Sequence, residues 1–416
     1  MAYMDTLCER VKSLREGSGL SQSGFAEKFN IPKSTLQDWE HDRRVPPVYV
    51  VEMMEKLINK SEIATPVSVD SPKTIELFAG AGGLALGVEK AGFNTIGLIE
   101  FDGDACDTLR KNRPEWNIIH DDIANISSLD LEEFFHIKKG ELDLLSGGAP
   151  CQAFSYAGKR LGFEDTRGTL FHHYAIFLQK LQPKIFLFEN VRGLLTHDGG
   201  KTYQTMLNVF EDAGYTIQKQ VMNAWDYGVA QKRERLITIG IRNDLVNKLS
   251  FSFPLPHEYK PVLRDILNDV PDSPYIPYGE KKRKLFELVP PGGYWRDIDP
   301  KLAKDYMKSC WEMEGGRTGI LRRLSLDEPS LAVLTSPSQK QTERCHPLEA
   351  RPFTIRENAR CQSFPDDWIF CGSTMSQYKQ VGNAVPVNLA YEVATQIHKA
   401  LEEYENGMDD RFYKEG

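Results

Sequence analysis

Residues 74–83 read TIELFAGAGG, and this stretch decides the fold class. Its first half, TIELF, is a short apolar run of the kind that forms a buried strand. Its second half is a glycine-rich turn, and a helical pattern begins near Leu84. A strand, a glycine turn and a helix in this order form the first unit of a sheet whose strands are joined by crossover helices.

Further apolar runs follow at intervals that suit such helices. The strand candidates after TIELF are TIGLIE, DLLSGG, IFLFEN and LITIGI. This alternation predicts an α/β domain with a doubly wound, mainly parallel sheet and helices on both faces. Ligands of such sheets bind outside the carboxyl ends of the strands, so the residues that follow each strand are the candidates for chemistry.

A thiol follows one of these strands. Residues 147–152 read GGAPCQ and come directly after an apolar run. Cys151, on a glycine-rich turn between a proline and a polar residue, suits nucleophilic attack. The alternative is a small buried cysteine with only a packing role.

The glycine turn and the next two strand ends carry groups that suit a nucleoside. The turn lets a ligand approach the backbone, and the helix after it directs N–H groups at that ligand. Glu100 ends TIGLIE, where a carboxylate can accept from a ribose diol. Asp121 and Asp122 come before Ile123, at the strand end that follows TIGLIE, and either can accept from an adenine amino group. These features indicate an adenosine-type cofactor, and the alternative is a tight turn beside exposed acids.

Two more strand ends carry charged groups. Glu189 follows the apolar run IFLF, beside the expected Cys151 turn, and can serve as a proton donor. Residues 231–235, QKRER, precede LITIGI, and strand alternation sends Arg233 and Arg235 to one face, where they can hold a phosphate or a base carbonyl. The alternative for both segments is a solvated strand end.

Residues 1–60 read as a separate domain of short amphipathic helices. Ser21 is the expected N-cap of one helix, and Asn30-Ile31-Pro32 separates it from the next. Residues 20–40 resemble the helix-turn-helix of the Cro and repressor family, whose second helix lies in the major groove. The alternative is a bundle used for packing or dimerisation. The DNA contacts that this resemblance implies are Gln22, Lys33, Ser34, Thr35 and Gln37.

Composition limits the remaining possibilities. The formal net charge is −8, but acidic and basic residues are equal in number within 1–60 and within 251–350, so either segment can present a basic face to DNA. Residues 251–350 lose periodicity and are rich in Pro, Gly and aromatic residues, which favours a folded, loop-rich domain. The seven cysteines lack zinc-site spacing, so we expect no metal and no disulfides. No membrane-length apolar run or signal-peptide pattern is seen, which predicts a cytoplasmic protein with no membrane partner.

The complete set of motifs resembles the C5-cytosine DNA methyltransferases over about residues 74–400. The motifs that carry the resemblance are FAGAGG, the glutamate of the next strand, DI, GGAPCQAFS, ENV, Q-x-R-x-R, RENARCQSFPDDW and QVGNAVP, in that order. A helix-turn-helix domain before such an enzyme is similar to a subset of restriction-modification methyltransferases that repress their own operon. The resemblance implies the S-adenosylmethionine-dependent methyltransferase fold, double-stranded DNA as substrate, and operator DNA bound by a dimer through the N-terminal domain.

Residues 61–72 are poor in bulky apolar groups and contain two prolines, which predicts a linker, and this composition together with the resemblance gives a domain organisation. It comprises a helix-turn-helix domain (1–60), a linker (61–72), a catalytic domain (73–250), a target-recognition domain (251–350), a return segment (351–376) and the C-terminal part of the catalytic domain (377–402).

Residue roles follow from the same resemblance. The Cys151 thiolate adds to C6 of a cytosine swung out of the duplex, Glu189 donates to N3, Arg235 binds the base carbonyl, and Arg233 supports the Cys151 loop or a phosphate. The implied DNA contacts outside the N-terminal domain are Gln152, Ser155, Arg317, Arg322 and Arg323. The implied cofactor contacts are Phe78, Gly80, Gly82, Gly83, Leu84, Glu100, Asp122, Ile123, Pro150, Asn383 and Val385.

Two other functions are compatible with these residues. One is a non-catalytic transcriptional repressor that keeps a methyltransferase scaffold, and the intact set of Cys151, Glu189 and Arg235 argues against it. The other is an RNA cytosine-5 methyltransferase, against which the long variable region and the helix-turn-helix favour DNA.

Overall fold

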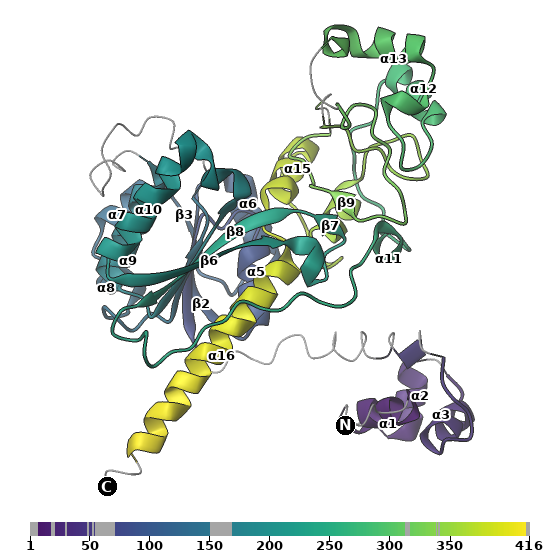
Figure 1. Cartoon of the computed structure of the whole chain (residues 1–416). Helices are drawn as coiled ribbons and strands as arrows, with labels where there is room; N and C mark the ends of the chain where they lie inside the picture. The colour runs from purple at the N-terminus through teal and green to yellow at the C-terminus, as the bar shows by residue number, and fades with distance from the viewer. Residues whose placement is uncertain are drawn as a thin grey trace. The chain divides into compact units, whose positions relative to one another are not determined.

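The computed structural model describes residues 7–17, 21–29, 31–47, 50–51, 54, 71–149, 169–312, 317–337, 339 and 342–412. The chain divides into two compact units, Met1–Ser68 and Val69–Gly416 (Figure 1). The division falls inside the segment 61–72.

The N-terminal unit contains a helix-turn-helix. Its described helices are α1 (Leu7–Gly17), α2 (Gln22–Lys28) and α3 (Lys33–Glu40). Ser21 Oγ accepts a hydrogen bond from Gly24 N–H at 3.2 Å, which confirms Ser21 as the cap of α2. Phe25, Leu36 and Trp39 are buried together and form the core between α2 and α3.

The second unit is built on a seven-stranded sheet. The strands lie in the order β3 (Ile118–His120), β2 (Asn94–Glu100), β1 (Lys73–Leu77), β4 (Leu144–Gly147), β5 (Ile185–Val191), β8 (Glu234–Arg242) and β6 (Tyr215–Asn223). Strands β1 to β5 are parallel, as expected from the alternating pattern. Strand β8 is antiparallel to both of its neighbours, β5 and β6, so the sheet is mixed at this end.

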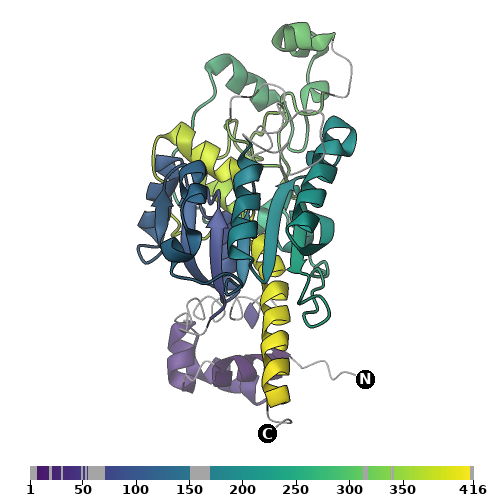
Figure 2. The ribbon, with the colours of Figure 1, turned by 90° about the vertical axis from the view of Figure 1, so that its left-hand side faces the viewer.

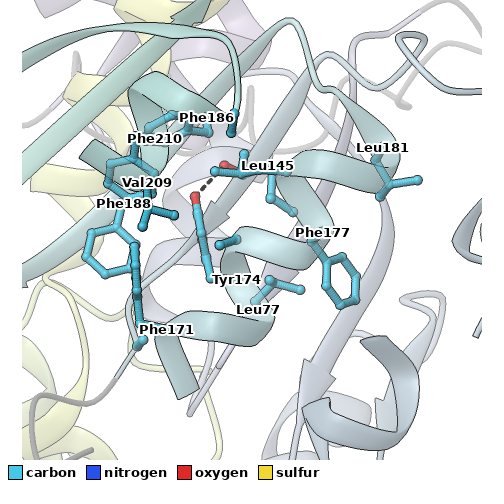
Figure 3. Close-up of a cluster of buried hydrophobic side chains, with 14 of the residues drawn as sticks. Leu77, Leu145, Phe171, Tyr174, Phe177, Leu181, Phe186, Phe188, Val209 and Phe210 are labelled. Carbon is cyan, nitrogen blue, oxygen red and sulfur yellow. Dashed lines mark hydrogen bonds between the residues drawn. The ribbon is translucent and has the colours of Figure 1, made fainter. Parts of the chain in front are cut away.

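Side chains of alternate strand residues enter two different cores, which explains the continuous apolar runs. Phe186 and Phe188 of β5 face a core formed with α7 (Ile123–Ser128), α8 (Leu131–Phe135), α9 (Leu170–Leu181) and α10 (Lys201–Asp212). Figure 3 shows this cluster around Tyr174, whose hydroxyl donates to Leu145 O at 3.3 Å. Ile185 and Leu187 face the opposite core.

That opposite core is closed by α5 (Gly83–Lys90) and the long α16 (Val387–Phe412). A Cβ on Gly87 would lie 2.5 Å from the Ala390 side chain, so this glycine lets the two helices approach closely. The C-terminal segment therefore returns to the first strands of the sheet. Helix α6 (Gly103–Asn112), α14 (Ile355–Cys361) and α15 (Thr374–Asn383) pack beside them.

Residues 251–350 are loop-rich, as the sequence predicts. Their elements are α11 (Leu263–Ile266), α12 (Glu280–Leu288), α13 (Pro300–Met307), the 3₁₀ turns η6 (Trp295–Asp297) and η7 (Lys308–Trp311), and the short β9 (Ser330–Leu331), which pairs in parallel with β7 (Gln231–Lys232). The 3₁₀ turns of the sheet region are η3 (Arg192–Leu195), η4 (His197–Gly200) and η5 (Ala224–Tyr227). Both views of the ribbon show α12 and α13 at the opposite end of this unit from the free end of α16 (Figures 1 and 2).

Candidate functional site

The glycine turn after β1 lies at the carboxyl edge of the sheet. Phe78, Gly80 and Gly82 have φ values of 60°, 54° and 84°. This left-handed region suits glycine, and a non-glycine residue there, such as Phe78, is uncommon. A Cβ on Gly82 would also lie 2.7 Å from the Leu109 side chain. Glycine is therefore required at 82 both by backbone conformation and by packing.

Glu100 binds the glycine turn to the end of β2. Its Oε2 accepts from Gly80 N–H at 2.7 Å, and its Oε1 accepts from the N–H groups of Phe101 and Asp102 at 2.9 and 2.8 Å. A carboxylate has about four acceptor positions, so one remains for a ligand hydroxyl. This position fits the predicted contact with a ribose.

Phe101, which the sequence analysis did not select, is 71% exposed directly beside this carboxylate. An exposed aromatic ring at a strand end provides a surface on which a base can stack. It could have been found from the sequence, because it directly follows a strand-end acid. Glu100 and Phe101 together fit the adenosine part of a cofactor.

Asp121 and Asp122 lie at the end of β3, next to β2. Asp122 Oδ1 accepts from Ala124 N–H at 2.9 Å and caps α7. Asp121 Oδ1 accepts from Asn125 Nδ2 at 2.8 Å, and hydrogen bonds from Asn125 and from the Asp122 backbone lower the pKa of Asp121. Both acids bind local groups, so the structure does not choose between them as the adenine contact. Ile123 is buried directly after them.

The C-terminal segment reaches the same edge of the sheet. A Cβ on Gly83 would lie 2.2 Å from Val385 O, so only glycine lets this backbone lie on the start of α5. Asn383 is exposed at this position. Leu84 is buried in the core, which leaves its backbone as the part available to a ligand. Residues far apart in sequence thus meet at the glycine turn.

The turn that carries the thiol is only partly described. Pro150, Cys151, Gln152 and Ser155 lie outside the described residues. The two residues before this segment are held by the end of β5: Ala149 O accepts from Asn190 Nδ2 at 3.0 Å, and a Cβ on Gly148 would lie 2.7 Å from Glu189 Oε2. The Glu189 carboxylate therefore lies against the beginning of the Cys151 turn.

Glu189 forms an ion pair with Arg235. Arg235 Nε lies 2.6 Å from Glu189 Oε1, and the two side chains are only 11% and 13% exposed. The pair exists because β8 is antiparallel to β5, with Val191 opposite Arg235. An antiparallel strand begins at the edge where parallel strands end, so the first residues of β8 meet the last residues of β5.

Arg233 is buried and holds backbone carbonyls. Its Nη2 donates to Gly382 O at 2.7 Å and its Nη1 donates to Val333 O at 3.2 Å. Burial, reinforced by the charge of Arg235, lowers the pKa of Arg233 to about 9. With 4% of the residue exposed, a structural role is favoured over phosphate binding.

The arginines predicted to contact DNA in residues 251–350 are also used internally. Arg323 donates to Pro347 O, Phe286 O and Val289 O, and Arg317 donates to Cys310 O and Trp311 O. The structure does not support DNA contacts for these two residues. Arg322 Nη2 lies 3.8 Å from Glu328 Oε2. A DNA contact of Arg322 stays a prediction.

In the N-terminal unit the predicted DNA contacts lie at the start of α3 and α2. Lys33 and Ser34 are exposed, and Thr35 is half-buried. Gln37 Nε2 donates to Gln22 Oε1 at 3.2 Å, and Gln22 Nε2 donates to Glu40 Oε2 at 2.6 Å. These hydrogen bonds fix the angle between the two helices.

Glu76 is an acid that was not among the predicted site residues. It lies inside the sheet beneath the site. Ser146 Oγ donates to its Oε2 at 3.3 Å. Burial raises the pKa of Glu76 to about 8. Burial therefore favours the neutral form of this carboxyl group.

Comparisons with known proteins agree with this geometry. Residues 72–399 match the family model for C-5 cytosine-specific DNA methylases, and residues 11–63 match a helix-turn-helix model. The chain is 57% identical to the Type II methyltransferase M.Sau96I of Staphylococcus aureus over 79% of this chain and 76% of that protein. It is 44% identical to the Type II methyltransferase M.Eco47II of Escherichia coli over 94% of this chain and 97% of that protein.

Solved structures support the fold. The Entamoeba histolytica methyltransferase EhMeth superposes with a TM-score of 0.55 at 16% identity, over 80% of this chain and 99% of that one. Across the described part of the chain, no helix has both the length and the apolar character needed to cross a membrane.

Proposed function

Because the chain belongs to the family of C-5 cytosine-specific DNA methylases and carries a helix-turn-helix domain, we propose that it methylates C5 of a cytosine in a specific duplex site. The modification would protect DNA from the partner nuclease of a restriction-modification system. Since the proposed substrate is the DNA of the cell, we expect it to act in the cytoplasm.

One observation carries the proposal. Glu189 and Arg235 form a shielded ion pair at 2.6 Å, and the Glu189 carboxylate touches the position of Gly148, three residues before Cys151. A carboxyl group that can be protonated and a cation then lie at the edge of the sheet from which the Cys151 turn begins. This is the set of groups that an electron-poor pyrimidine requires.

The reaction begins with attack of the Cys151 thiolate on C6 of the cytosine. As the S–C6 bond forms, N3 takes a proton from Glu189 while Arg235 holds the base carbonyl, and C5 becomes electron-rich. C5 would then bond to the methyl group as the bond between that methyl group and the sulfonium sulfur of the donor breaks, and the sulfur would leave as a thioether. Transfer of the C5 proton to a base, together with return of the N3 proton to Glu189, then restores the double bond and expels the Cys151 thiolate.

S-Adenosylmethionine, the methyl donor used by this family, supplies an electrophilic methyl group when bound. Glu100 and Phe101 would hold its adenosine part, with Asn383 and Val385 on the other side of the glycine turn.

The stacked duplex shields C6, so the target base must leave the helix, at a cost of a few kcal/mol. Fluorescence of 2-aminopurine placed at the target position measures this step, and an unchanged signal on binding argues against extrusion.

The decisive experiment is transfer of a labelled methyl group to duplex DNA, with Cys151→Ala as the inactive variant. Bisulfite sequencing of DNA from expressing cells then gives the methylated site. Transfer to tRNA in a parallel assay, with none to duplex, would establish the RNA alternative. Transfer to neither substrate, together with operator binding, would favour a repressor on a methyltransferase scaffold.

For the N-terminal unit we expect operator binding as a dimer and repression of the protein's own transcription. The exposed Lys33 and Ser34 at the start of α3, on a helix pair fixed by Gln22 and Gln37, support this role. Removing residues 1–60 should abolish operator binding and leave methylation of short duplexes intact. A truncated protein that folds but cannot methylate would contradict this division of function.

A further inference from the structure

The segment around β9 is held by one side chain of β7 and by the side chain of Arg233, which lies between β7 and β8. Gln231 Oε1 accepts from Val333 N–H at 2.8 Å, and Arg233 Nη1 donates to Val333 O at 3.2 Å. Gln231 is fully buried and Arg233 nearly so. Parallel pairing of Gln231 with Ser330 adds to these contacts. The backbone N–H and carbonyl of Val333 are thus both hydrogen-bonded. We use the name recognition strand for β9 together with the residues that follow it, 332–335.

The recognition strand packs directly on the end of α15. A Cβ on Gly382 would lie 2.5 Å from the carbonyl group of Leu334 and 2.6 Å from Thr335 N. Arg233 joins the two segments, because its Nη2 donates to Gly382 O at 2.7 Å. Any residue larger than glycine at position 382 would push the recognition strand away from the end of α15.

The end of α15 leads into the turn that carries Asn383 and Val385. Gln362 holds this turn, since its Nε2 donates to Val381 O at 2.8 Å and to Ala384 O at 3.1 Å. Gln231 Nε2 in turn donates to Gln362 Oε1 at 2.8 Å. One buried hydrogen-bond network therefore fixes both the recognition strand and the turn beside the glycine loop.

We propose that Arg233 and Gly382 are positioning residues that couple the recognition strand to the cofactor turn. A displacement of the strand by bound duplex then moves Asn383, and a bound cofactor restrains the strand. The inference rests on the proposed cofactor contacts of Asn383 and Val385. Coupling of this kind is reciprocal, so DNA and cofactor change each other's affinity by the same factor.

Gly382→Ala tests the coupling by adding one methyl group. Alanine favours a helix interior by about 1 kcal/mol, so α15 should persist while the strand is displaced. We expect S-adenosylhomocysteine to bind about tenfold more weakly in the absence of DNA, a size typical of coupled sites. We also expect the factor by which S-adenosylhomocysteine tightens duplex binding to fall toward one. The proposal would be overturned if S-adenosylhomocysteine bound more weakly but still tightened duplex binding by the wild-type factor.

Two control variants separate the possible failures. Gly279→Ala adds the same methyl group where nothing lies within 4 Å, and it should bind both ligands as the wild type does. Asn383→Ala tests the proposed cofactor contact by itself. If Asn383→Ala binds S-adenosylhomocysteine normally, the contact is wrong; if it binds weakly and Gly382→Ala binds normally, only the coupling is wrong.

The wild-type protein gives an independent test. S-Adenosylhomocysteine without DNA should slow hydrogen exchange at Val333 and Thr335, which lie on the recognition strand, and should leave α13 unchanged. Unaltered exchange at the strand would refute the coupling without any variant.

Arg233→Lys, which keeps one donor, should retain more of the coupling than Arg233→Met.

Discussion

Arg235, at the edge of the sheet, and two arginines of the recognition region, residues 251–350, use their side chains differently. Arg235 has its backbone paired in the ladder, directs Nε to the Glu189 carboxylate, and donates Nη1 to the carbonyl of the adjacent Glu234. In the recognition region, Arg317 and Arg323 donate to carbonyls of their own loops. Regular backbone satisfies its own carbonyls, whereas irregular backbone needs other donors. A loop-rich domain therefore uses for its own folding the residues that would otherwise be selected as DNA contacts.

Buried carboxyl groups show the same contrast. Glu343, in the recognition region, accepts from Tyr306 Oη and Leu321 N–H, both at 2.6 Å, and lies 2.8 Å from Lys282. Glu76, inside the sheet, has Ser146 Oγ at 3.3 Å. In the irregular region a cation joins the donors around the acid, whereas Glu76 accepts from the Ser146 hydroxyl and from the Ala85 backbone, and its burial favours the protonated form.

The largest effect should come from Glu189→Gln, which removes the proposed proton donor at the sheet edge. We expect kcat/KM for methyl transfer to fall by about 10²–10⁴, the contribution typical of a general acid. Glu234→Gln is the matched control, because Glu234, the first residue of β8, pairs with the exposed Arg192 of η3, directly after β5. Affinity for S-adenosylhomocysteine should be retained in both variants. Wild-type turnover in Glu189→Gln would remove the acid from the mechanism.

Glu76→Gln tests the protonated acid inside the sheet through the pH dependence of stability. The pKa of Glu76 is raised to about 8 in the folded protein. Between about pH 4.5 and 8 the unfolded chain loses this proton while the folded one keeps it, so stability falls as pH rises, by up to about 1.4 kcal/mol per pH unit.

The amide that replaces this carboxyl group does not titrate, so urea unfolding of Glu76→Gln from pH 5 to 8 should show a flatter dependence than in the wild type. Replacing the exposed Glu115 by glutamine should leave the slope unaltered. An identical slope in Glu76→Gln would mean that this carboxyl is ionised in the folded state.

Arg323→Met tests the structural use of arginine in the recognition region. The variant leaves the carbonyls of Phe286, Val289 and Pro347 without this donor, and we expect a stability loss of about 2–4 kcal/mol. The salt dependence of DNA binding should be unchanged, whereas loss of a phosphate contact lowers the slope by about one. Arg283→Met removes an exposed ion pair with Glu287 within α12. It should have little effect on stability or on the salt dependence of DNA binding.

The sequence predicts the parallel part of the sheet well, because strands buried on both faces read as apolar runs. The same runs give the positions of Glu100 and Glu189, since chemistry follows strand ends. Strand β6 was missed because it lies at the edge of the sheet, where Gln218, Lys219 and Gln220 interrupt the pattern. The contact between Glu189 and Arg235 also could not be derived, since periodicity carries no information about strand direction.

The recognition region is the less predictable part for a related reason. Which carbonyls remain unpaired depends on the path of the whole loop, so residue type alone cannot tell an internal arginine from a DNA-binding one. Gln231 illustrates the same limit: its side chain bonds Val333, Cys361 and Gln362, all far away in sequence. Such networks are fixed by tertiary structure and not by local pattern.

The smallest effect is expected for Phe101→Ala, which tests whether a regular strand end leaves its side chain free for a ligand. The Phe101 N–H is bound by Glu100, and the ring is 71% exposed. Loss of stacking on adenine should weaken S-adenosylhomocysteine binding by about 1–3 kcal/mol, the range found for aromatic stacking on bases. Phe134→Ala, on α8, is the control for removal of an exposed ring. Equal calorimetric affinities for Phe101→Ala and the wild type would show that the adenosine part binds elsewhere.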